Sequence, residues 1–248
     1  MNTIYILWLR QIKRYLRSRA RIVGSLGQPI LFLVALGFGF GPVYAKAGGG
    51  NYLEFLAPGV IAMSILFTAV FAGIEVIWDR QFGFLKETLV APVSRLKIMF
   101  GRTLGGATVA VMQGVIVFAL TLLFGFRPHS LALLPLAFLF MFIIALLFTA
   151  MGTAIASVLE DMQGFQLIMN FLIMPVFFLS GALFPLDNLP KTVAIITRFD
   201  PLTYGVDGLR GAFIGLSHFG LHYDLLIISA ITAFFIVIGA YLFTKIEA

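Results

Sequence analysis

Two histidines and an aspartate near the C-terminus have a spacing that could hold a metal ion. His218 and His222 stand four residues apart with Asp224 close by, so a helix would place both imidazoles on one side. Gly220 lies between them, however, and no glutamate accompanies them as in a hydrolase motif. His129 is far away in the sequence. A metalloenzyme is therefore a disfavoured alternative, and we expect no metal site and no catalytic residues.

A second candidate for chemistry is Glu75, which lies within an apolar stretch, four residues before Asp79. Ionisable groups at membrane depth are costly and are functional candidates by default. Glu75 lies about one turn from the end of its stretch, within reach of Arg80 or Arg102, and we expect a structural ion pair. The alternative is proton or substrate binding in an ion-gradient-driven secondary transporter. Such transporters usually carry inverted repeats and buried charges near mid-membrane.

Six apolar stretches must position these side chains, and each is long enough to cross a bilayer. They cover residues 22–40, 55–78, 103–124, 131–159, 165–184 and 225–243. A span needs roughly 20 mostly apolar residues, and in lipid every backbone N–H must be bonded within its helix. With 60% hydrophobic and only 11% charged residues, the chain is predicted to be an all-α, polytopic membrane protein with one transmembrane domain over residues 1–248.

The basic residues collect on one side of these predicted spans. Six precede the first span, five lie in or beside the loop after the second and one is Lys245, which places twelve of the 17 Lys and Arg residues on that side. Cytoplasmic flanks hold such an excess, so both termini are expected in the cytoplasm. The net charge of +6 then fits anionic membrane lipid as a partner better than nucleic acid. The chain has no cysteine, which excludes disulfides and thiolate metal sites.

Residues 1–21 have the pattern of an amphipathic helix that lies in the membrane interface. At about 100° per residue, an apolar side that includes Trp8 is opposed by a basic side. The basic side consists of Arg10, Lys13, Arg14, Arg17 and Arg21. Such a helix places its apolar side at the acyl boundary and its cations at lipid phosphates. It serves either as a topology signal or as an elbow that transmits movement from a cytoplasmic partner.

The cytoplasmic loop over residues 79–98 is predicted to contain a short helix with a docking face. Phe82, Leu85 and Leu89 share a face at helical spacing, and Pro92 ends the helix. The charged residues beside this face are Arg80, Lys86 and Glu87. An exposed apolar face next to charges is typical of a docking surface. The alternative is a juxtamembrane helix that rests on lipid headgroups.

This loop resembles the coupling-helix signature of ABC exporter permeases of the type-2 family, which include drug-resistance and polysaccharide or lipooligosaccharide exporters. The matching residues are Trp78-Asp79-Arg80, Gly83-Phe84-Leu85, Glu87 and the run from Leu89 to Arg95. Two other regions are similar to that family, namely Ala57-Pro58-Gly59, and an outer region with Ser180 to Pro185, Leu189-Pro190, Asp200 to Tyr204 and Arg210. Asp200 stands where the family usually has Asn. The resemblance covers essentially the whole chain.

The resemblance implies a division of labour between subunits. The chain contains no Gly-x4-Gly-Lys-[Ser/Thr] phosphate loop, so we expect that ATP and Mg²⁺ are bound by a separate cytoplasmic ABC ATPase subunit and that this chain needs no cofactor. The residues implied to contact that ATPase are Arg80, Gly83, Phe84, Leu85, Lys86, Glu87, Leu89 and Pro92. The resemblance also implies a homodimer in a prokaryotic cytoplasmic membrane that exports an apolar or amphipathic cargo such as a drug, a lipid or a lipid-linked glycan.

Residues 185–224 are predicted to form short outer helices that re-enter the membrane. The glycines that recur along one helix face are Gly205, Gly208, Gly211 and Gly215. Small residues allow close packing, whereas each glycine costs an exposed helix roughly 1 kcal/mol relative to alanine. Asp207 and Arg210 can pair with each other or with neighbours. An irregular glycine-rich loop is the alternative.

Four residues are candidates for lining a cavity between two copies, because the resemblance suggests that the second and fifth spans surround it. They are Phe67, Phe71, Asn170 and Phe177. Gly101 and Gly105 at the start of the third span are expected to form a helix contact instead of a ligand site.

Overall fold

The computed structural model describes residues 3–48, 50–84, 93–187 and 189–245, and all regular structure within these ranges is helical. Six helical segments are long and apolar enough to cross a membrane, which confirms the predicted all-α architecture with six spans. They cover Arg19–Phe38, Tyr52–Gln81, Arg95–Leu123, Leu131–Val158, Met162–Leu179 and Leu221–Thr244. The third span begins at Arg95 and not at residue 103. Its first two turns carry charged residues, and the predicted apolar stretch began only after them.

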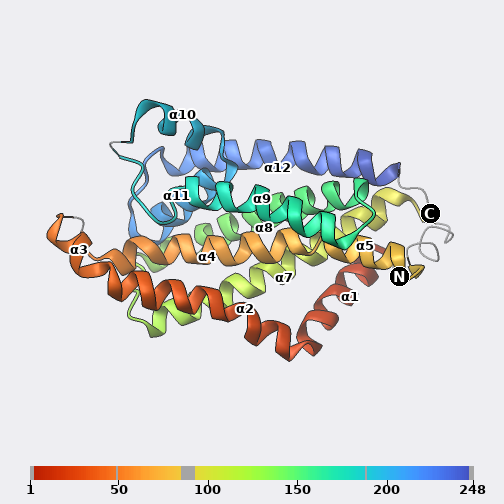
Figure 1. Ribbon diagram of the computed structural model, residues 1–248, viewed down its shortest axis with the longest axis horizontal. Helices are drawn as coiled ribbons and strands as arrows, with labels where there is room; N and C mark the ends of the chain where they lie inside the picture. The colour runs from red at the N-terminus through yellow and green to blue at the C-terminus, as the bar shows by residue number, and fades with distance from the viewer. Residues whose placement is uncertain (1–2, 49, 85–92, 188, 246–248) are drawn as a thin grey trace.

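The N-terminal helix α1 (Thr3–Arg17) is followed by a first span that is not uniform. Ser18 separates α1 from α2 (Arg19–Phe32), which continues as the π-helical turn η1 (Leu33–Phe38) and then as the short helix α3 (Gly41–Lys46). α1 and α2 diverge as the two arms of a V (Figure 1). One arm packs against α7 (Arg95–Leu123) and the other against α4 (Tyr52–Phe71).

The second span consists of two helices, α4 and α5 (Ile74–Gln81), whereas the sequence predicted one unbroken helix over residues 55–78. At the break, Gly73 N donates to Val70 O at 3.0 Å. This bond joins residues three positions apart, whereas the bonds of an α-helix join residues four positions apart. A Cβ atom on Gly73 would lie 2.4 Å from the carbonyl oxygen of Gly152 in α8 (Leu134–Val158). This close backbone contact requires a glycine directly before the helix that carries Glu75.

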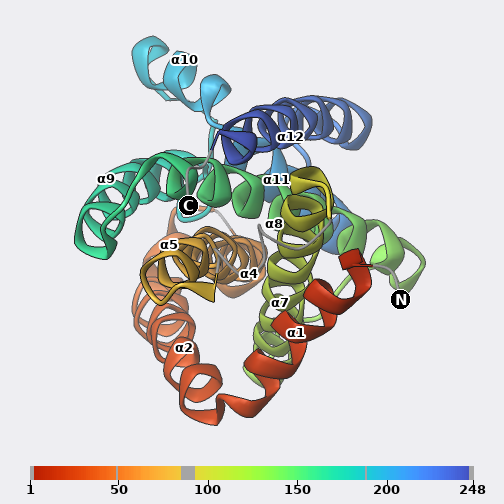
Figure 2. The same ribbon diagram turned by 90° about the vertical axis from the view of Figure 1, so that its right-hand side faces the viewer.

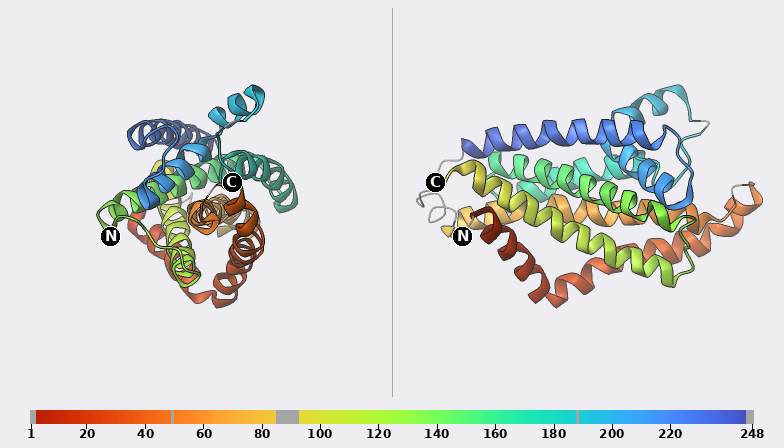
Figure 3. Two further views of the ribbon diagram at one scale, coloured as in Figure 1. Left: turned by 90° about the vertical axis from the view of Figure 1, so that its left-hand side faces the viewer. Right: turned by 180° about the vertical axis from the view of Figure 1, so that it is seen from behind.

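The remaining elements complete a bundle whose central helices are α4 and α8. They are η2 (Leu131–Leu133), α9 (Met162–Leu179), α10 (Lys191–Phe199), α11 (Pro201–Ile214) and α12 (Leu221–Thr244). α4 contacts α7, α8 and α11, and most of its side chains are buried. The start of α1 and the ends of α5 and α12 lie at one end of the bundle, while α3, α10 and α11 lie at the other (Figures 1 and 3).

Residues 201–214, in the predicted outer segment, form the buried helix α11. Asp200 caps it by accepting a hydrogen bond from Leu202 N at 2.9 Å, and Gly215 ends it with a φ of 75°. Burial raises the pKa of Asp200 to about 8, so the carboxyl is largely neutral at pH 7. α11 packs against α4, α8 and α12. Its entry into the bilayer remains a prediction.

Candidate functional site

Helix α1 lies in close contact with α7 because two glycines of α7 leave room for it. A Cβ atom on Gly101 would lie 3.0 Å from Leu7 Cβ, and one on Gly105 would lie 2.6 Å from Gln11 Cγ. Leu7, Gln11 and Tyr15 are buried in this contact. Gly101 and Gly105 therefore form a helix contact, as predicted, and their partner is the N-terminal helix.

Two side-chain hydrogen bonds add to this contact between α1 and α7. Trp8 Nε1 donates to Thr108 Oγ1 at 3.0 Å, and the Tyr15 hydroxyl donates to Gln113 Oε1 at 2.7 Å. Burial raises the pKa of Tyr15, with Arg21 opposing the shift, so the hydroxyl keeps its proton at neutral pH. The apolar side of the predicted interfacial helix is thus partly covered by α7 instead of lying entirely at the acyl boundary.

We expect Tyr15→Phe to lower the free energy of unfolding by about 1–3 kcal/mol, because it leaves a buried amide oxygen without a donor. Tyr5→Phe is the matched control, since Tyr5 is on the same helix but is 49% exposed. Thermal unfolding of the purified protein in detergent provides the comparison. Equal midpoints for the two variants would show that the Tyr15 hydrogen bond does not hold α1.

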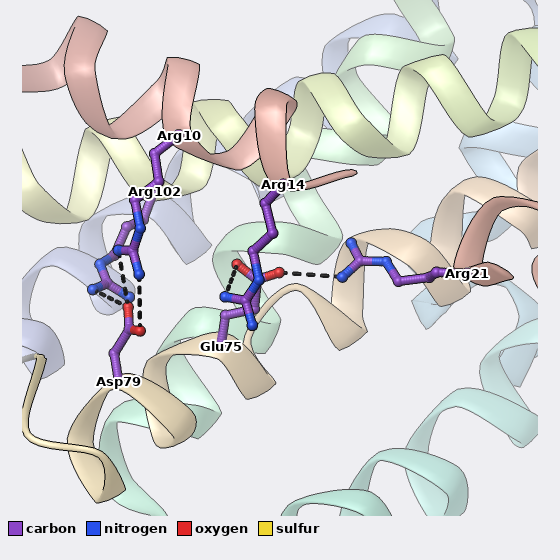
Figure 4. A network of polar contacts seen from close by, with 6 residues as sticks. All are labelled: Arg10, Arg14, Arg21, Glu75, Asp79 and Arg102. Carbon is purple, nitrogen blue, oxygen red and sulfur yellow. Dashed lines mark hydrogen bonds and ion pairs between the residues drawn. The ribbon is translucent and has the colours of Figure 1, made fainter. Parts of the chain in front are cut away.

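Asp79, near the end of α5, is bound by arginines from two other helices. Arg102 of α7 donates to Asp79 Oδ2 at 2.5 Å, and Arg10 of α1 contacts both carboxylate oxygens at 3.2 and 3.3 Å. Asp79 and Arg102 are 6% and 4% exposed, so this pair is shielded from water. Figure 4 shows the three side chains converging from α1, α5 and α7.

Glu75, one turn earlier on α5, forms the second half of the same network (Figure 4). Arg14 of α1 lies 3.6 Å from one carboxylate oxygen, and Arg21 of α2 lies 3.3 Å from the other. The prediction that Glu75 pairs with Arg80 or Arg102 was wrong. Arg80 donates to Leu159 O at 3.4 Å, and Arg102 binds Asp79. Glu75 is 4% exposed, and both its oxygens have a guanidinium partner.

We call Arg10, Arg14, Arg21, Glu75, Asp79 and Arg102 the α5 ion-pair network. It contains four guanidinium groups and two carboxylates, so it carries an excess of positive charge. Removing one member of a buried ion pair typically costs about 3–5 kcal/mol, because the other charge is left without compensation. The network therefore binds α1, α2 and α7 to the last turns of α5 and restricts how these four helices can move apart.

The predicted docking loop was expected from residue 79, but α5 continues to Gln81, and Phe84 just after this helix is in contact with α1. The Arg10 guanidinium lies over the ring of Phe84 at 3.9 Å from the centroid. Gly83 has a φ of 79°, a left-handed conformation that favours glycine. The other predicted contact residues lie outside the described residues: Leu85, Lys86, Glu87, Leu89 and Pro92. Arg10 thus contacts both Asp79 and the start of the loop.

The basic residues of α1 fall into two groups that differ in their partners, although the sequence pattern placed them all on one basic side. Arg10 and Arg14 bind carboxylates of α5, whereas Lys13 and Arg17 form no ion pair within the described part of the chain. All four line an open groove together with Ile6, Leu9 and Ser18. Their contact with lipid phosphates stays a prediction.

The predicted outer residues Asp207 and Arg210 do not bind each other. Asp207 accepts hydrogen bonds from the backbone N–H groups of His218 and Phe219 at 2.8–2.9 Å. Arg210 donates to Gly181 O at 2.9 Å, and its guanidinium lies 3.9 Å from the centroid of the Phe55 ring. Each side chain therefore anchors a different loop to the buried helix α11.

The glycines of α11 allow close contact with two helices, α8 and α12. A Cβ atom on Gly205 would meet Ile144 of α8, and one on Gly211 would meet Leu221 of α12. At Gly208 the contact is closest, with Phe140 Cε1 only 2.2 Å from the position of the added atom. Three of the four predicted glycines thus allow close packing, and Gly215 ends the helix.

The four candidates for cavity lining lie in different surroundings within one copy of the chain. Phe67 and Phe71 line the same cavity, beside α1, α2 and α7. Phe177 of α9 packs against Phe32 of α2 with its ring centroid 5.8 Å away, and Asn170 is exposed. At the disfavoured metal position, His218 Nδ1 lies 3.0 Å from Asp187 Oδ1. No metal-binding group of three or more such side chains occurs within residues 3–48, 50–84, 93–187 and 189–245.

Six helical segments that are long and apolar enough to cross a membrane define the class of a polytopic membrane protein, with a buried ion-pair network beside its second span. The profile of the ABC-2 type transporter family matches residues 2–214. The chain therefore belongs to the ABC-2 type transporter family. This family implies a membrane permease subunit that works with an ABC ATPase partner.

Similar proteins come from bacteria and from algae. Nodulation protein J of Rhizobium leguminosarum bv. viciae is 29% identical over 235 residues, which cover 93% of this chain and 90% of that protein. The inner membrane transport permease YadH of Escherichia coli K12 is 26% identical over 214 residues, covering 85% and 82% of the two chains. The putative transport permease ycf38 of Cyanophora paradoxa is 27% identical over 217 residues, covering 85% and 73%.

Proposed function

We propose that this chain is the membrane-spanning subunit of an ABC exporter in which the α5 ion-pair network carries motion from residues 79–98 to the N-terminal helices. Two copies form the transport unit, and a separate cytoplasmic ATPase binds ATP and Mg²⁺. The cargo is an apolar or amphipathic molecule such as a drug, a lipid or a lipid-linked glycan. Both termini face the cytoplasm of a prokaryotic cell.

The observation that carries this proposal is the position of Asp79 and Glu75. Both lie on α5, a helix of eight residues that leads into the loop that resembles a coupling helix, and both are bound by arginines of α1 or α2. A force applied to the loop by the ATPase would act first on α5. Because the ion pairs tie α5 to α1 and α2, those helices would move with it.

The contacts of Glu75 favour coupling over the proton-binding alternative. Both carboxylate oxygens are engaged by guanidinium groups. A transported ion or substrate would have to displace Arg14 or Arg21 before it could reach this carboxylate. The network thus supports a permanent mechanical link.

The assignment of the loop is tested by crosslinking to a coexpressed ABC ATPase. The chain has no cysteine, so single cysteines introduced at positions 84 to 90 are unique probes. We expect them to crosslink to the ATPase, and we expect Leu85→Asp, Leu89→Asp and Glu87→Lys to abolish ATP-dependent export, because a carboxylate or a reversed charge would be buried in the contact. A cysteine at position 216, at the other end of the bundle, is the control and should not crosslink.

Two results would contradict this assignment. One is normal export by all three variants, and the other is the absence of any crosslink from positions 84 to 90 in a complex that hydrolyses ATP. Copurification of the ATPase with the unmodified chain shows beforehand that the complex has formed.

A further inference from the structure

The structure contains a cavity of about 290 Å³ next to the α5 ion-pair network, with the network's Arg21 in its lining. It lies between α1, α2, α4, α5 and α7, and Figure 2 shows α1, α2, α5 and α7 arranged around this region. Its apolar wall is formed by Phe67, Phe71, Ile74 and Trp78. The polar wall includes Tyr15, Ser25 and Gln113.

Gln113 is the residue in this wall whose side-chain amide lacks a complete set of hydrogen-bond partners. Its side chain is 1% exposed, and its oxygen accepts the hydroxyl proton of Tyr15 at 2.7 Å. Its Nε2 atom is buried and has no hydrogen-bond partner within the described part of the chain. A buried donor without an acceptor is costly, so this site favours a molecule that brings an acceptor oxygen.

The charges at the cavity are already compensated. Arg21 also lines it, and its guanidinium binds Glu75 at 3.3 Å and lies 5.7 Å from the centroid of the Tyr15 ring. An ionic ligand would have to compete with that ion pair. The lining therefore suits an uncharged molecule with an apolar body and a single polar end.

We propose that this cavity binds an uncharged amphiphile, whose apolar chain lies against Phe67, Phe71 and Trp78 and whose ester or hydroxyl oxygen accepts a hydrogen bond from Gln113 Nε2. About 290 Å³ is close to the lower limit of ligand pockets and holds one chain segment, not a whole diacyl lipid. The same chemistry is offered by the ester region of a bilayer lipid and by a free single-chain ester. The site differs from the docking loop and needs no ATPase.

Tryptophan fluorescence tests this proposal, because the chain has only two tryptophans and one of them lines the cavity. Trp8→Phe leaves Trp78 as the only reporter. The protein is placed in nanodiscs of a diether phosphatidylcholine, which has no ester oxygen to accept the hydrogen bond from Gln113. Two ester-linked probes with dibrominated chains are titrated separately, a monoacylglycerol and a diacyl phosphatidylcholine. We expect quenching that saturates at a low mole fraction of probe, above the linear quenching by bulk lipid. Saturation by the diacyl probe assigns the site to bilayer lipid, and saturation by the monoacylglycerol alone assigns it to free amphiphiles.

Three further variants define the site. Gln113→Leu should raise the half-saturating mole fraction about tenfold through loss of the hydrogen bond, whereas Gln28→Leu, the same change at an exposed position of α2, should not. Ser25→Phe should fill the cavity and abolish saturation. Trp78→Phe, which reports on Trp8 outside the cavity, should show linear quenching only.

Two outcomes would overturn the proposal. The first is purely linear quenching of Trp78 by both probes. The second is saturable quenching that Gln113→Leu leaves unchanged, because the cavity would then hold an apolar chain without using the amide. Thermal unfolding of each variant excludes those that have lost the native fold from the comparison.

Discussion

Replacing Asp79 with alanine is expected to lower the free energy of unfolding by about 3–5 kcal/mol, because Arg102 would remain buried beside it without a carboxylate. Arg102 is 4% exposed and its shortest contact is the 2.5 Å bond to Asp79. Arg10, by contrast, has a side chain that is 34% exposed and can turn to water. Most of the loss should therefore come from Arg102. The measurement is thermal unfolding in detergent, together with the yield of monodisperse protein.

Two companion variants separate this mechanism from a general effect of losing a carboxylate. The double variant Asp79→Ala with Arg102→Met should recover much of the stability, since no buried charge is left unpaired. Asp187→Ala should cost less than about 1 kcal/mol, because Asp187 is a largely exposed partner of His218. If the double variant were as unstable as the sum of the two single variants, the ion pair would not be the source of the effect.

Replacing Gly208 with leucine should have a similarly large effect at the end of the bundle that holds α10 and α11. The added Cβ atom would lie 2.2 Å from Phe140 Cε1, and Phe140 is fully buried. Overpacking of this kind typically costs 1–3 kcal/mol or more. We expect reduced thermal stability and reduced export, while the ATPase still binds at the opposite end.

Gly27→Leu is the matched control for Gly208→Leu, because a Cβ atom on Gly27 meets nothing within 4 Å. Adding Phe140→Ala to Gly208→Leu should restore part of the lost stability by making room for the leucine. Normal stability and export of Gly208→Leu would mean that α11 is held loosely and that the predicted close packing is mistaken.

The helical class and the number of spans could be predicted because lipid imposes a strong constraint on composition and length. The break at Ala72 and Gly73 could not, since it depends on the backbone of Gly152, 79 positions away. Similarly, the spacing of Gly101 and Gly105 predicted a helix contact but not its partner. Which helix packs against these glycines is set by the tertiary structure, and their spacing alone does not specify it.

The ion pairs of Glu75 show the same limit at the site. The predicted partners, Arg80 and Arg102, lie close to Glu75 along the sequence or at the start of the next span. The actual partners, Arg14 and Arg21, precede the first span and are brought to α5 by the turn at Ser18 between α1 and α2. The hydrogen bond from Tyr15 to Gln113 was missed for the same reason. The sequence feature that indicated α1 as a source of partners for buried carboxylates was its excess of arginines over carboxylates.

The most direct test of the coupling proposal is the movement of α1 when the ATPase is trapped with nucleotide. Spin labels at Leu16 on α1 and Tyr241 on α12, both exposed, report the distance between these helices in the assembled complex. We expect this distance to change on addition of ATP and vanadate in the protein with the native network and in the double variant Lys13→Gln/Arg17→Gln. It should stay constant in Arg10→Gln/Arg14→Gln, which removes both ties from α1 to α5 while Arg102 and Arg21 still partner the carboxylates. The same nucleotide-driven change in both double variants would contradict the account.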